Sequence, residues 1–179
     1  MTVLQVEDDP MGELLEQIAD QADVLASLRT GVGRSLDEAP SSWPYVVRVS
    51  QGKRWREAPA HVTITLFALH HQGKEPGSLN EPGRGLGRSA LELRTVREAA
   101  GGSAEGVERR MRALMGADEL DALAVHLRGL VQLMRAADVS LDYVRLYKDL
   151  CSWMRPEWRS RVCYRWAREY FQIEKQEKK

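Results

Sequence analysis

The stretch His61-Val-Thr-Ile-Thr-Leu-Phe-Ala-Leu-His70-His71-Gln72-Gly73 decides the fold class of this 179-residue chain. Its beginning, Val62-Thr-Ile-Thr, is the only run in the sequence that favours a β-strand. The apolar residues continue through Leu66 and Leu69, however, and a run of this length is typical of a helix of about four turns. We therefore predict a helix whose β-branched residues are buried.

Helical spacing continues on both sides of this stretch. Apolar residues recur every three or four positions, and we find no period-two run bounded by hairpin turns. Asp9-Pro10 predicts the start of a first helix that ends near Gly31, and Ala39-Pro40 starts a short helix. Further helices are expected at residues 86–99, 104–115, 118–137, 140–154 and 156–173. The sequence thus predicts an all-α helical bundle.

Glycine and proline divide the chain into two predicted subdomains. The break at Gly101-Gly102-Ser103 separates an N-terminal helical subdomain, residues 1–100, from a C-terminal one, residues 103–179. Residues 73–83 contain three glycines and two prolines, the highest density in the chain, so we expect a mobile loop there. Together with the arginines that follow, residues 73–88 form a basic loop.

The segment Gly83-Arg84-Gly85-Leu86-Gly87-Arg88 sets arginines beside glycines at a predicted helix start. Backbone N–H groups and the helix dipole favour an anion there, and the two guanidinium groups would add donors. The segment lacks the glycine spacing of a dinucleotide fingerprint, and the chain contains no Gly-Lys-Ser/Thr phosphate loop. It therefore predicts a phosphate clamp without nucleotide hydrolysis.

The net charge of zero hides an uneven distribution. Residues 1–23 carry seven acids and no base, which leaves an excess of seven positive charges on residues 24–179. Twenty of the 26 basic residues are arginine, whose side chain forms bidentate hydrogen bonds to phosphate and stacks on bases. Arg128 and Arg135 are seven residues apart on one predicted helix, so basic stripes that follow a nucleic-acid backbone form easily.

Other functional classes have little support in the sequence. The four histidines have no cysteine or carboxylate at metal-ligand spacing, and His70 and His71 are better explained by packing. We find no nucleophile motif or catalytic carboxylate pair, and we predict no enzyme activity, cofactor or metal. Cys151 and Cys163 are expected to be reduced thiols. No signal peptide or apolar membrane segment is visible, so we expect a cytoplasmic protein.

The five tryptophans are numerous for the length of this chain. Trp153 and Trp166 are expected in the core between the last two helices. Trp55 lies between Arg54 and Arg56, and it either packs locally or offers a platform on which a nucleic-acid base stacks.

Several segments, taken jointly, resemble the CasB family, the small subunit of the type I-E CRISPR RNA-guided complex Cascade. They are Leu28-Arg-Thr-Gly-Val-Gly, Thr65-Leu-Phe-Ala-Leu-His-His-Gln, Gly85-Leu-Gly-Arg-Ser-Ala-Leu, Val107-Glu-Arg-Arg, His126-Leu-Arg-Gly-Leu-Val, Leu141-Asp-Tyr and Asp149-Leu-Cys-Ser-Trp. The resemblance implies an all-helical, non-catalytic subunit, present as two copies arranged head to tail, that contacts the backbone and large subunits of Cascade. It further implies binding to the CRISPR RNA, the target DNA and the displaced non-target strand.

The resemblance also assigns basic sites residue by residue. The matching positions are Arg29, Arg34, Arg88, Arg109, Arg110 and Arg128. Charge and loop placement alone add Lys74, Arg84, Arg112, Arg155 and Arg159. These residues would neutralise phosphates without reading sequence and so stabilise the R-loop. The alternative is a helical protein-interaction scaffold whose arginines only form surface salt bridges.

Overall fold

The computed structural model describes residues 9–171 and confirms an all-α fold in which these residues form no strand. An isolated parallel bridge joins Asn80 to Leu141. The α-helices are α1 Pro10–Ile18, α2 Ala22–Arg29, α3 Trp43–Ser50, α4 Glu57–His70, α5 Leu86–Ala99, α6 Glu105–Met115, α7 Leu120–Ala136, α8 Tyr143–Trp153 and α9 Pro156–Phe171. Three short 3₁₀ helices are η1 Leu36–Glu38, η2 Pro40–Ser42 and η3 Arg54–Arg56.

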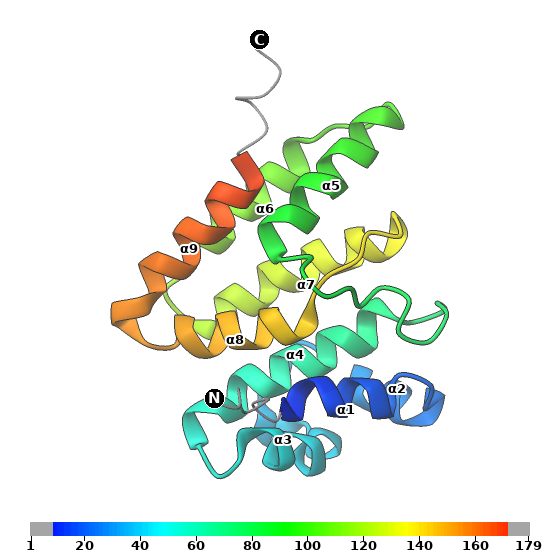
Figure 1. Cartoon of the computed structure of the whole chain (residues 1–179), viewed down its shortest axis with the longest axis vertical. Helices are drawn as coiled ribbons and strands as arrows, with labels where there is room; N and C mark the ends of the chain where they lie inside the picture. The colour runs from blue at the N-terminus through cyan, green and yellow to red at the C-terminus, as the bar shows by residue number, and fades with distance from the viewer. Residues whose placement is uncertain (1–8, 172–179) are drawn as a thin grey trace, which may run out of the picture.

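Helix α4 lies at the centre of the molecule. In Figure 1 it runs between the layer formed by α1, α2 and α3 and the pair α7 and α8. Ten of its 14 residues are buried, and apart from Glu57 only a stripe of Ala58, Val62 and Leu69 keeps some exposure. The stretch that favours a strand locally is helical, as predicted, and a helix at this central position buries most of its side chains.

Two buried threonines of α4 satisfy their own polar groups. Thr63 Oγ1 donates to the carbonyl oxygen of Pro59 at 2.8 Å, and Thr65 Oγ1 donates to that of His61 at 2.8 Å. A buried hydroxyl without such a partner costs about 1–3 kcal/mol. These contacts with the preceding turn let polar residues occupy the faces that meet α2, α7 and α8.

The first predicted helix is wrong in one respect, since the chain bends at residues 19–21 and forms two helices. Gln21 N donates to the carbonyl oxygen of Ile18 at 3.0 Å and then begins α2 with a non-helical backbone. The bend lets α1 pack on α3, α4 and α8 while α2 turns onto α4. A single straight helix would carry one of these two apolar faces away from the core.

The loop between α4 and α5 was expected to be mobile, but the structure anchors it to residues 138–143. Leu141 N donates to Leu79 O at 3.0 Å, and Asp142 N donates to Arg84 O at 2.8 Å. Asp142 Oδ2 also accepts from Gly83 N at 2.7 Å, and Asn80 Oδ1 accepts from Tyr143 N. The loop that contains these glycines and prolines is thus held against residues 138–143 by backbone hydrogen bonds, because buried backbone polar groups require partners.

In the described part of the chain, the contact between α5 and α9 is more extensive than that of any other pair of helices. Helix α5 also contacts α6 and α7. These contacts group α5 with the helices that follow it, as Figure 1 shows. The division into two subdomains at residues 100–103 stays a prediction. One apolar cluster extends from Met11 to Tyr170 across both halves.

Two predicted core tryptophans are fully buried, as expected. Trp166 Nε1 donates to Asp149 Oδ2 at 2.7 Å, and Arg165 forms an ion pair with the same carboxylate. Desolvation raises the pKa of Asp149, and the charge of Arg165 opposes this shift. Cys151 and Cys163 are free thiols.

The histidines of α4 are buried, which confirms that packing explains them. The Tyr143 hydroxyl lies 2.9 Å from His70 Nδ1, and His71 Nε2 accepts from Leu79 N at 3.2 Å. Burial, followed by the charge of His71, lowers the pKa of His70 to about 3. Among residues 9–171 no cluster of histidine, cysteine and carboxylate side chains suits a metal ion. No helix in this range has both the length and the apolar character needed to cross a bilayer.

Gly87 sets the distance between α5 and α9. A Cβ built there would lie 2.2 Å from the carbonyl oxygen of Trp166 and 2.7 Å from Glu169 Cβ. We expect Gly87→Ala to lower the free energy of unfolding by about 3 kcal/mol, because the obstacle includes backbone. Urea denaturation measures this change. Gly106→Ala, in a helix with room for a methyl group, is the matched control and should cost nothing. Equal effects at both positions would contradict the packing role.

The buried histidine predicts a pH-dependent stability. The folded state holds the pKa of His70 at about 3, below its ordinary value of 6.5, so the unfolded state binds the proton first. The resulting stability is present above pH 6.5 and is lost at about 1.4 kcal/mol per pH unit as the pH falls from 6.5 towards 3. Denaturation curves between about pH 7 and 4 measure this slope, which should be shallower in His70→Gln than in His126→Gln. Equal slopes in the two variants would contradict the prediction.

Candidate nucleic-acid interface

The predicted phosphate clamp at the start of α5 is already filled by side chains of this chain. Arg145 and Glu169 form an ion pair beside Gly85, and a Cβ on Gly85 would lie 2.7 Å from both side chains. Helix α9 covers Gly87 in the same way. Arg84 is paired with Glu81 and Glu92. The glycines thus serve the close approach of α5 and α9 and leave little free space beside them, and the phosphate clamp at this helix start stays a prediction.

Arginines from three separate elements lie on, against or beside α7. Arg34 follows Gly33 in the loop after α2, and a Cβ on Gly33 would lie 3.0 Å from Arg128 Nη1 of α7. The next residue of α7, Gly129, faces Arg110 of α6. We call Arg34, Arg128 and Arg110 the basic track. None of the three has a carboxylate within ion-pair distance among residues 9–171.

Two glycines make room for the basic track. Gly33 has φ +76°, a conformation that disfavours residues with a Cβ. A Cβ on Gly129 would lie 2.8 Å from Arg110 Nε, so the glycine lets this side chain lie across α7. Arg110 Nη1 donates to the carbonyl oxygen of Gly106 at 3.0 Å, which fixes its guanidinium near the helix surface.

A groove of about 470 Å³ lies beside the basic track, between the loop at residues 32–38, α4 and α7. Arg34 and Arg128 line it, together with Glu38, Asp121 and the exposed Val125. Glu38 is engaged in a capping box with Ser35 at the start of η1. The groove therefore offers guanidinium donors at its rim and apolar surface within.

Other predicted sites are engaged with carboxylates. Lys74 pairs with Asp138, and Arg112 pairs with Glu108 one turn earlier on α6. Exposed pairs of this kind contribute little stability, yet they neutralise the charge offered to a ligand. Together with Arg84, these residues are weaker candidates for phosphate contacts than the basic track.

Four further predicted residues are either exposed without an ion pair or packed against other parts of the chain. Arg88 and Arg109 are exposed on α5 and α6 and form no ion pair with the described residues. Arg29 is half-buried, and its Nη1 lies 3.5 Å from the carbonyl oxygen of Ala68. Arg159 covers the Trp153 ring at 4.1 Å and donates to the carbonyl oxygen of Asp118 at 3.0 Å, so it joins α9 to neighbouring elements.

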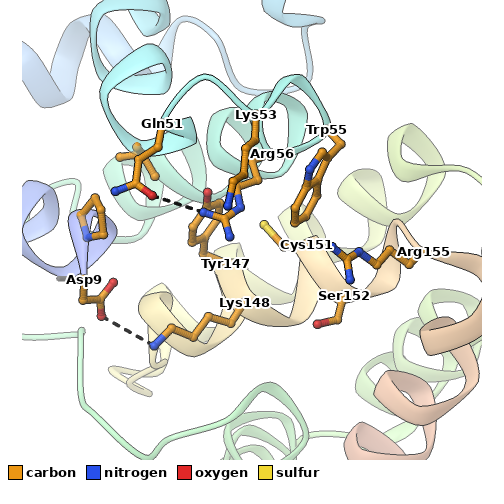
Figure 2. A pocket seen from close by; sticks show the side chains of 12 residues that line it. Asp9, Gln51, Lys53, Trp55, Arg56, Tyr147, Lys148, Cys151, Ser152 and Arg155 are labelled. Carbon is orange, nitrogen blue, oxygen red and sulfur yellow. Dashed lines mark hydrogen bonds and ion pairs between the residues drawn. The ribbon is translucent and has the colours of Figure 1, made fainter. Parts of the chain in front are cut away.

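Arg155 belongs to a basic cleft whose assembly the sequence did not reveal. Lys53, Trp55 and Arg56 from the η3 side face Lys148 and Arg155 from the α8 side, as Figure 2 shows. The cleft has a volume of about 600 Å³. Sequence reasoning identified the cluster around Trp55 and separately Arg155, but it missed Lys148. The only local signal was the separation of Lys148 and Arg155 by about two helical turns, which is ordinary for a solvent-facing helix.

Comparison with known proteins identifies the family. The sequence profile of the CRISPR-associated protein Cse2 family matches residues 24–171, from α2 to the end of α9. The chain belongs to the Cse2 family. A CRISPR-associated protein Cse2 of Thermus thermophilus is 34% identical over 132 residues, which cover 74% of this chain and 69% of that protein.

Solved CasB structures share the fold of this Cse2 protein. The crystal structure of CasB from Thermobifida fusca has a TM-score of 0.70 and 25% identity, covering 90% of this chain and 97% of that one. The crystal structure of CasB from Thermus thermophilus has a TM-score of 0.68 and 29% identity, with 92% and 94% covered. The resemblance to CasB inferred from sequence segments is thus confirmed, and the protein is a CRISPR Cascade subunit.

Proposed function

We propose that this Cse2 protein holds nucleic-acid strands within Cascade through contacts with their phosphates. It retains the displaced non-target DNA strand and braces the duplex of CRISPR RNA and target DNA. The R-loop is thereby stabilised without any catalytic step. The observation that carries this proposal is the basic track: Arg34 and Arg128 line one groove, and Arg110 lies against Gly129 of the same helix α7. None of the three forms an ion pair with a carboxylate among the described residues.

The proposed mechanism is electrostatic and independent of sequence. Guanidinium groups bind phosphate through two parallel N–H donors, and each phosphate contact releases condensed counterions. Exchanging a DNA duplex for an RNA–DNA duplex is close to energetic balance, so a few backbone contacts shift the exchange towards the R-loop. Arg88 and Arg109 are exposed on neighbouring helices and extend the charged surface beyond the basic track.

The proposal includes protein partners. A second copy of this chain and the backbone and large subunits of Cascade would cover other faces of the molecule. The solvent side of α1 and α2 carries Glu13, Glu16 and Asp23. Their negative charge repels nucleic acid, which makes this side suited to a protein neighbour.

The first test measures binding of the purified protein to unrelated DNA and RNA single strands by fluorescence anisotropy over a salt series. We expect sequence-indifferent affinity that falls steeply with salt. Replacing Arg34, Arg110 and Arg128 together by glutamine should reduce the slope of log affinity against log salt by about 2, since each single-strand phosphate contributes about 0.7. The control replaces Arg84, Arg94 and Arg112 by glutamine, an equal change in net charge at arginines already paired with glutamates.

The same two triple variants are then assembled into Cascade, and the lifetime of the R-loop is measured. The variant of the basic track should assemble normally but shorten the lifetime, while the control stays near the wild-type value. A variant that folds and assembles with an unchanged R-loop lifetime would overturn the proposal. That outcome would favour a scaffold that only contacts proteins.

A further inference from the structure

The cleft between η3 and α8, which we call the Trp55 cleft, holds a second kind of site. We propose that it binds one nucleotide of a single nucleic-acid strand, with the base against Trp55 and the adjoining phosphates at Lys53, Lys148 and Arg155. The inference rests on the proposed function, since both involve nucleic acid. It adds a site that contacts bases to a surface that otherwise contacts only phosphates.

The backbone builds one wall of the Trp55 cleft. Gln51 and Gly52 both have positive φ, at +51° and +74°, and so reverse the chain after α3. A non-glycine residue in this conformation is uncommon, and such strained positions cluster at functional sites. The reversal places η3 opposite α8, where Figure 2 shows both walls directing side chains into the space between them.

The charge of the Trp55 cleft favours an anion. Four basic side chains line it, those of Lys53, Arg56, Lys148 and Arg155, while Asp9 is the only acid among the described residues of the lining. Asp9 Oδ2 lies 3.9 Å from Lys148 Nζ, at the limit of an ion pair. The net positive charge is thus available to phosphates.

The indole of Trp55 provides the stacking surface. Its side chain is 37% exposed, and the guanidinium carbons of Arg56 and Arg155 lie 5.0 and 4.7 Å from its ring centroid. Arg155 is exposed and joined to the turn before α9, so it can leave the ring for a phosphate when a base takes its place. Stacking of a base on an aromatic side chain tolerates every base, because each has a flat π face.

A buried hydroxyl supplies independent support for a ligand. Tyr147 lines the cleft and is 7% exposed, and apart from the neighbouring Cys151 thiol, a weak hydrogen-bonding group, its hydroxyl has no partner among the described residues. Figure 2 shows the hydroxyl directed towards the wall that carries Gln51 and Arg56. Burial raises the pKa of Tyr147, so the hydroxyl stays protonated and can donate to a phosphate oxygen or a base edge.

The size and chemistry of the cleft favour a nucleotide over an acidic peptide. Its volume of about 600 Å³ lies within the range of small-molecule sites. An acidic peptide would use the four basic side chains but would leave the indole face without a planar partner. A nucleotide uses the indole, the basic side chains and the Tyr147 donor together.

The test compares a twelve-residue oligothymidylate with an abasic strand that has the same number of phosphates, using fluorescence anisotropy and the full-length protein. The wild-type protein should bind the oligothymidylate about tenfold more tightly. Trp55→Ala should remove this preference and leave the affinity for the abasic strand within about twofold. Trp55→Phe keeps an aromatic face and should retain most of the preference. Trp158→Ala is the matched control, because Trp158 is similarly exposed and lies under Arg161 outside the cleft.

A second variant tests the phosphate contacts separately. Lys53→Gln combined with Lys148→Gln should weaken binding of both strands alike and lower the salt slope by about 1.4, the value for two phosphates. Unchanged slopes in this variant, or an unchanged preference for oligothymidylate in Trp55→Ala, would overturn the inference. Tighter binding of an oligoglutamate peptide than of oligothymidylate, lost in Trp55→Ala, would also overturn it in favour of an acidic protein segment.

The two proposals fail in different ways. If the wild-type protein binds neither oligothymidylate nor the abasic strand, and the basic-track variant leaves the R-loop lifetime unchanged, both the proposed function and the Trp55 cleft are rejected. If binding depends on Arg34, Arg110 and Arg128 while Trp55→Ala has no effect, only the Trp55 cleft is rejected.

Discussion

The burial of most of the surface of α4 is the constraint on which the structure depends. A helix with apolar residues on most of its surface needs several partners, and α1, α2, α3, α7 and α8 supply them. The bend between α1 and α2 and the anchored loop after α4 both follow from this need. The polar residues of α4 are tolerated because threonine hydroxyls bond the preceding turn and His70 meets Tyr143. One central helix thus fixes the order of the elements around it.

Close packing of α5 on α9 explains the glycines at the start of α5. Gly85 and Gly87 allow the approach, and the Arg145–Glu169 pair fills the space beside the helix start. An anion site requires both free N–H groups and free space, and little free space is left there. Glycines beside arginines therefore mark helix packing at α5 but arginine positioning at Gly33 and Gly129. Glycine thus serves two structural purposes in this chain, and which one applies depends on the group that lies beside its Cα atom.

The arginines of this Cse2 protein divide by their partners. Those at positions 84, 94 and 112 lie beside glutamates within one or two turns, so their charge is balanced locally. The basic track and the Trp55 cleft instead gather positive charge from elements far apart in the sequence. Zero net charge is compatible with a nucleic-acid partner because the acids of α1 and α2 lie elsewhere on the molecule.

The sequence by itself determined the fold class, the family and the helices, apart from the bend that divides the first helix into α1 and α2, because apolar periodicity and capping residues act within a few turns of one another. It also identified the arginines of the basic track and the cluster around Trp55. Only the tertiary structure decided that the glycines of the Gly83–Arg88 segment allow α5 to pack closely on α9. It also decided that Lys148 and Arg155 face Trp55. These outcomes depend on contacts between residues separated by tens of positions, such as Gly87 with Trp166 and Gly33 with Arg128. Local patterns carry no signal for such contacts, because their geometry arises only when the helices pack.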